Sequence, residues 1–128
     1  MYDKMERYLY LHHYIATVSS DKLYNIQVLK KLVQFLTSEE TLVRARSVGV
    51  IHNLSVDGVA ISLIVESGCT PLLVSLLRDS SAEICRSAAG TIQNLSRDTH
   101  ARQLIVDAGV VEHISDLLFA SDVPCQVS

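Results

Sequence analysis

Apolar side chains in the second half of the chain recur at the spacing of an α-helix. Within residues 81–96 they fall at i, i+4, i+8 and i+11, which places them on one helix face, whereas alternation of the β type is weak. These positions are Ile84, Ala88, Ile92 and Leu95. Ser80 and Glu83 have the spacing of a capping box, in which a hydroxyl and a carboxylate satisfy free N–H groups of the first turn. The pattern predicts a long helix over residues 81–96.

Shorter helices are predicted on both sides of this one. They are expected over residues 59–67, 70–78, 100–108 and 111–119. Gly68 and Gly109 separate them and permit a sharp, left-handed turn that a Cβ would resist. Pro71 is tolerated in a first helical turn, where no backbone donor is needed. Thr37 and Glu40 repeat the capping-box spacing and predict a further helix start.

The sequence repeats itself with a period of 41 residues. The recurring segments are Asn53-Leu54-Ser55 with Asn94-Leu95-Ser96, Leu63-Ile64-Val65 with Leu104-Ile105-Val106, and Leu76-Leu77 with Leu117-Leu118. Between residues 41–80 and 82–121, 14 of 40 positions are identical, and Gly49 matches Gly90. A fixed period of this length is typical of proteins built from stacked helical units.

The order of a short helix, a glycine turn, a second helix and a longer helix ending in Asn-Leu-Ser resembles the armadillo repeat. Two segments carry the resemblance, Ile64-Val65-Glu66-Ser67-Gly68-Cys69-Thr70-Pro71-Leu72-Leu73 and Ser87-Ala88-Ala89-Gly90-Thr91-Ile92-Gln93-Asn94-Leu95-Ser96. Residues 89–96 are more similar to the beta-catenin branch than to the importin-alpha branch. The resemblance implies an all-α fold, a right-handed α-solenoid of armadillo repeats, and a role in binding proteins.

The period divides the chain into five expected parts. They are an N-terminal capping helix region (1–24), the end of a degenerate repeat (25–38), two repeat units (39–79 and 80–120) and the start of a truncated further repeat (121–128). All five tyrosines lie in the first part, where they either cover the first layer or form an exposed docking patch. The last layer is expected to be partly uncovered, as in a fragment, a short isoform or a chain that meets another copy or subunit.

The composition of the chain argues against several classes of function. The chain has 128 residues and a net charge of -3, which argues against a nucleic-acid binder that depends on a positive field. Its apolar runs are too short to span a bilayer and its N-terminus lacks a signal-peptide core, so we expect an intracellular protein, cytoplasmic or nuclear, without membrane insertion. Three cysteines without a C-x-x-C pair suit a reducing compartment.

No catalytic constellation is recognisable in the sequence. His12 and His13 are neighbours and would point about 100° apart on a helix, so they do not form an i, i+4 metal pair. Glycine loops for phosphate and nucleophile elbows are missing from the sequence. We therefore expect no enzyme, no metal and no cofactor.

The candidate binding residues lie on the longest helix of each unit. Armadillo repeats are similar in placing an asparagine where Asn53 and Asn94 stand, and the resemblance implies that its amide holds the main chain of an extended peptide in a concave groove. Gly49 and Gly90 stand where importin-like repeats carry a tryptophan, so reading of a nuclear signal is not expected.

Arginines on the same helices are candidates for charge selectivity. Arg46 and Arg86 would favour an acidic or phosphorylated segment of the partner. The alternatives are that the asparagines cap backbone and that the arginines are merely solvated. A structural role, in which the ends of the solenoid pack against another copy or a fixed subunit, is the rival function.

Overall fold

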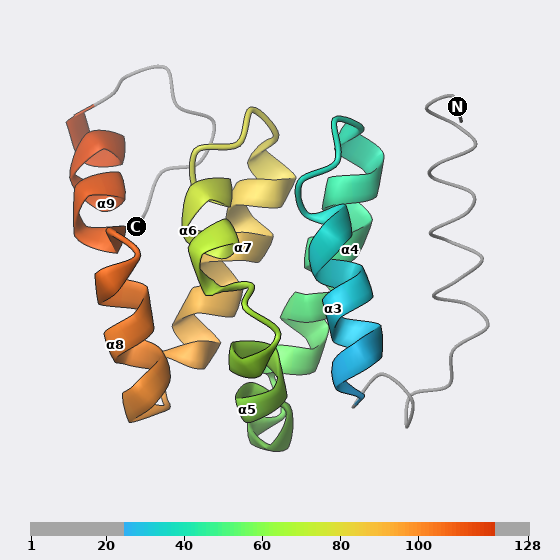
Figure 1. The fold of residues 1–128 in the computed structure, drawn as a ribbon. Coiled ribbons are helices and arrows are strands. Elements are labelled where there is room, and N and C mark those ends of the chain that lie inside the picture. Colours follow the sequence, from blue (N-terminus) through green and yellow to red (C-terminus); the bar gives the residue numbers. More distant parts are fainter. Residues whose placement is uncertain (1–24, 120–128) are drawn as a thin grey trace.

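The computed structural model describes residues 25–119, and this part of the chain is helical without a β-strand. Figure 1 shows the helices stacked side by side. They are α3 (Ile26–Phe35), α4 (Thr41–Ser55), α5 (Gly58–Glu66), α6 (Thr70–Leu76), α7 (Ala82–Leu95), α8 (Thr99–Asp107) and α9 (Val110–Phe119). The expected capping region of residues 1–24 and the further repeat of residues 121–128 lie outside the described residues.

The helices form two successive sets with the same order. A helix of 15 residues (α4) is followed by the short helices α5 and α6, and a helix of 14 residues (α7) is followed by α8 and α9. The long helices α4 and α7 pack against each other, and α3 and α6 pack against α4 and α7 respectively (Figure 1). The predicted all-α stack of repeated units is confirmed, whereas its right-handed sense stays a prediction.

Glycine turns separate the short helices as the sequence predicts. Gly68 and Gly109 have φ angles of +82° and +86°, and no other residue of the described part has a positive φ. This left-handed conformation costs glycine little and strains residues with a Cβ. Pro71 stands in the first turn of α6, where its missing N–H leaves no helical hydrogen bond unmade.

The helix starts differ from the two predicted capping boxes. Ser81, and not Ser80, caps α7, because its hydroxyl accepts the N–H of Ile84. The N–H of Ser81 itself donates to the carboxylate of Asp79, which fixes the turn before the helix. At α4 the cap is Glu40, which makes no side-chain cap hydrogen bond, so the capping box predicted with Thr37 is wrong as well.

The core runs continuously through the stack. Its fully buried side chains are mostly leucine and isoleucine: Leu29, Leu32, Leu36, Ile51, Ile64, Leu73, Ile84 and Leu95. Cys69 and Cys85 are buried as well, and their thiols donate weak hydrogen bonds to the carbonyls of Ile64 and Asp79. Because each layer contributes to one shared cluster, the units stabilise one another rather than folding separately.

Two arginines join consecutive units at their turns. Arg44 on α4 pairs with Asp79 at 2.9 Å and also donates to the carbonyl of Ser38, while both partners of the ion pair are largely buried. Arg97, in the turn after α7, donates to the carbonyls of Ser55 and Val56 at the end of α4. These contacts satisfy backbone groups that a helix end leaves free.

Within residues 25–119 no single helix is long and apolar enough to cross a membrane. The pair formed by α5 and α6 reaches the required length and hydropathy only when taken together, and the two helices are bent by 96° at the break between them.

Candidate binding groove

A groove of about 340 Å³ lies between α4 and α7. Its lining comes from the faces of the two long helices that point away from the core: Leu42, Ala45, Arg46, Gly49, His52, Asn53, Glu83 and Ser87. The opposite face of α4 carries buried residues such as Val43, Val48 and Ile51. The groove is therefore lined by the residues of α4 and α7 that the core leaves at the surface.

Three predicted site residues of α4 meet in this groove. Arg46, Gly49 and Asn53 are spaced at i, i+3 and i+7, so they form one stripe of the helix surface. Gly49 leaves open space beside the stripe, because a Cβ at this position would meet no atom within 4 Å. The absence of this side chain widens the groove between Arg46 and Asn53.

The polar groups of the groove are free to bind. The side chains of Asn53 and Arg46 are exposed and make no hydrogen bond or ion pair within residues 25–119. An amide offers two donors and an acceptor, and a guanidinium offers five donors. The groove thus presents hydrogen-bonding groups suited to a peptide main chain and to a carboxylate or phosphate.

The repeat-equivalent residue Asn94 has different surroundings. Its Nδ2 donates to the hydroxyl of Ser55 at 2.9 Å, and this hydroxyl in turn donates to the carbonyl of His52 at 2.6 Å. Asn94 does not line the groove, so within the described part its amide joins two units. The bond to Ser55 uses one of the two N–H donors of this amide and therefore reduces what it can offer to a ligand.

Gly90 is a place where α4 and α7 approach closely. A Cβ built on Gly90 would lie 2.5 Å from Nε2 of His52 and 2.9 Å from its Cε1. The missing side chain lets the imidazole of His52 lie across α7 and line the groove. The sequence alone assigned His52 no binding role. The feature that points to it is Gly90, which lies opposite His52 on the long helix of the next unit.

The remaining predicted residues lie outside the groove. Arg86 is exposed on α7 without an ion pair among the residues described, and Gly68, Gly109 and Pro71 stand at the turns. Arg44, the third arginine on these helices, is held in its ion pair with Asp79. Of the arginines on α4 and α7, Arg46 alone lines the groove.

The described part of the chain contains no group of three histidine, cysteine or acidic residues that could hold a metal ion. Burial raises the pKa of the Cys69 thiol from 9.0 to about 11, which keeps it protonated at neutral pH. A protonated, buried thiol is a poor nucleophile.

Comparison with known proteins matches this architecture. The family model of the armadillo/beta-catenin-like repeat matches residues 60–97, which run from α5 to the turn after α7. One similar solved structure is an engineered protein from the Northeast Structural Genomics Consortium, with 31% identity, a TM-score of 0.67 and coverage of 74% of this chain and 39% of that chain. A second engineered protein from the same consortium has 25% identity, a TM-score of 0.67 and coverage of 73% and 40%.

The chain thus spans about two fifths of the length of these two engineered proteins. No curated protein matches it. The predicted resemblance to the armadillo repeat is confirmed over residues 60–97.

Proposed function

Because the chain contains an armadillo/beta-catenin-like repeat, we propose that it is a non-catalytic protein-binding module that holds an extended segment of a partner between α4 and α7. The observation that carries the proposal is the free amide of Asn53 beside the free guanidinium of Arg46 in one groove. In such a complex the Asn53 amide engages an N–H and a C=O of the partner's main chain. The proposal includes the right-handed sense of the solenoid and a cytoplasmic or nuclear location.

Charge selects the partner in this proposal. Arg46 and His52 lie on one wall of the groove, and Glu83 and Ser87 lie on the other. Arg46 favours an acidic or phosphorylated side chain next to the main-chain segment that Asn53 holds, and Glu83 disfavours an acidic side chain on its own side. Asn94 and Arg86 belong to the next position along the stack and would serve a longer segment.

The proposal is tested by affinity capture from a cell lysate with matched amide substitutions. Asn53→Ala removes the amide in the groove, whereas Gln93→Ala removes an exposed amide of α7 outside it. We expect a set of captured proteins to be lost with Asn53→Ala and kept with Gln93→Ala, after circular dichroism has confirmed the helical content of both. Equal capture by the two variants would contradict the role of the groove.

Assembly through the ends of the stack is a second candidate function. It is favoured by Val106 and Val111, which are 55% and 63% exposed on the last two described helices. A molecular mass that rises with concentration, and falls back to that of one chain in Val106→Asp/Val111→Asp, would support it; a constant mass would exclude self-assembly.

A further inference from the structure

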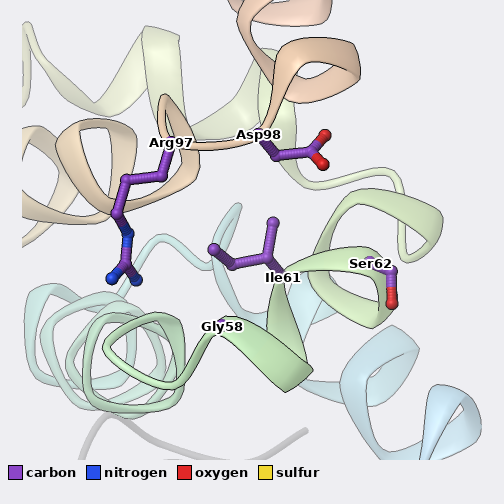
Figure 2. Close-up of a pocket in the computed structure, with 5 residues that line it drawn as sticks. All are labelled: Gly58, Ile61, Ser62, Arg97 and Asp98. Carbon is purple, nitrogen blue, oxygen red and sulfur yellow. The ribbon is translucent and has the colours of Figure 1, made fainter.

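A second groove lies between the short helices α5 and α8. One hollow of about 310 Å³ is lined by residues of α5 and of the turn before α8, and Figure 2 shows five of them as sticks. A neighbouring hollow of about 440 Å³ shares Ser62 and Asp98 with the first. The two hollows therefore adjoin, and together they are called the α5–α8 groove. The repeat-equivalent helices α5 and α8, unlike α4 and α7, do not pack closely.

The floor of this groove is apolar. Ile61 and Val65 of α5 and Leu104 of α8 contribute to it. Gly58 leaves one end open, because a Cβ there would meet no atom within 4 Å. Hollows of a few hundred Å³ with apolar floors suit one or two aliphatic side chains of a partner.

Two carboxylates lie along the groove, together with the imidazole of His100. Glu66 is exposed and makes no ion pair within residues 25–119, and Asp98 uses Oδ2 to cap α8 through the N–H of Ala101, which leaves Oδ1 free. The positive charge of Arg97 is directed elsewhere, since its guanidinium donates to the carbonyls at the end of α4. In Figure 2 the side chains of Arg97 and Asp98 point in different directions from the turn, with Ile61 between them.

From this geometry we propose that the α5–α8 groove is a second docking site, which takes a protein segment with aliphatic side chains flanked by lysine or arginine. The apolar floor binds the aliphatic side chains, and the carboxylates of Glu66 and Asp98 bind the basic ones. Its preference is opposite to that of the α4–α7 groove, where Arg46 favours acidic segments. Binding at the α5–α8 groove does not depend on the α4–α7 groove, and if both work as proposed one chain holds two different segments at the same time.

The test uses a short synthetic peptide in which leucines are flanked by lysines. The full chain, labelled with ¹⁵N, is titrated with this peptide, with a peptide carrying glutamates in place of the lysines, and with one carrying glycines in place of the leucines. We expect the lysine–leucine peptide to shift the backbone amides of Ser62, Glu66 and Leu104, and the other two to bind at least several-fold more weakly. Shifts confined to α4 and α7, or equal binding of all three peptides, would overturn the proposal.

Charge-neutral variants separate the acidic side chains from general electrostatics. Glu66→Gln/Asp98→Asn keeps the cap of α8, because asparagine also caps helices. This double variant should bind the lysine–leucine peptide roughly threefold to tenfold more weakly. Glu39→Gln/Glu112→Gln changes the net charge equally at two exposed acids outside the groove and should leave binding unchanged. Equal weakening by both double variants would show non-specific attraction and overturn the proposal. Glu66→Lys should strengthen binding of the glutamate peptide, and a failure to do so would also count against it.

Discussion

Gly49 and Gly90 offer a direct test of how α4 and α7 pack. Both are the ninth residue of a long helix, and both match in the 41-residue period. A glycine inside a helix costs about 1 kcal/mol relative to alanine. Since a Cβ on Gly49 would meet open space, Gly49→Ala should raise the free energy of unfolding by up to about 1 kcal/mol.

Gly90→Ala should not give this gain. Its Cβ would lie 2.5 Å from Nε2 of His52, so the imidazole must move. Turning a side chain off its rotamer costs about 0.5–1.5 kcal/mol, and overpacking typically costs about 1–3 kcal/mol. We therefore expect Gly90→Ala to be less stable than Gly49→Ala by about 1–3 kcal/mol.

The assay is urea unfolding followed by circular dichroism, with both substitutions made in the natural chain and in His52→Ala. In the His52→Ala background, Gly90→Ala should raise the free energy of unfolding by about 1 kcal/mol, because alanine favours the helix and no imidazole obstructs its Cβ. The double-mutant cycle between positions 52 and 90 should then give a coupling energy of about 1–3 kcal/mol. If Gly90→Ala stabilises the chain as much as Gly49→Ala while His52 is present, the close approach of His52 to α7 is refuted.

Three further predictions concern the packing of the units. Arg44→Met should lower the free energy of unfolding by about 3 kcal/mol in urea titrations, because it leaves the buried carboxylate of Asp79 without its cation; a loss below about 1 kcal/mol would mean that the pair contributes little. In thermal unfolding, Ser81→Ala should lower the free energy of unfolding by about 1 kcal/mol and Ser80→Ala should leave it almost unchanged. The reverse order would support the Ser80 cap predicted from the sequence. The pKa of the Cys69 thiol is 9.0 in the unfolded chain and about 11 in the folded one, so the contribution of the protonated thiol to stability is complete below pH 9 and is lost as the pH rises toward 11. In urea titrations, Cys69→Ala should make the free energy of unfolding fall less steeply over this pH range. An unchanged slope would contradict the raised pKa.

Local features of the fold were predictable because they depend on short stretches of sequence. Gly68 and Gly109 marked the turns, since only glycine adopts their positive φ without strain. The predicted helix over residues 81–96 differs from α7 by one residue at each end. The 41-residue period then related one unit to the next, which is why the all-α stack could be inferred without a structure.

Features that depend on contacts between units were not predictable in this way. The choice of Ser81 over Ser80 as the cap of α7 depends on Asp79, which Arg44 holds from the preceding unit. In the sequence the spacing to Glu83 favours Ser80, whereas the contact from Ser81 to the Asp79 carboxylate that Arg44 holds is visible only in the structure.

The candidate site shows the same division. Asn53 and Asn94 are equivalent in the sequence, but Asn94 meets the hydroxyl of Ser55 from the preceding unit and Asn53 makes no hydrogen bond to a described side chain. His52 enters the groove because Gly90 lies opposite to it, and this pairing joins residues of two units. The stripe of Arg46, Gly49 and Asn53 lies on one helix, so its helical spacing alone placed these residues together.

The groove between α4 and α7 is tested most directly by site-specific photocrosslinking. A photoreactive amino acid is placed at Ser87, which lines the groove, and in a separate chain at Ser75, which is exposed on α6 outside it. In cells, we expect crosslinks from position 87 to a partner segment. An excess of that segment, added as a peptide, should reduce them, and they should be absent in Asn53→Ala. Crosslinks of equal yield from positions 75 and 87, or crosslinks at position 87 that persist in Asn53→Ala, would contradict it.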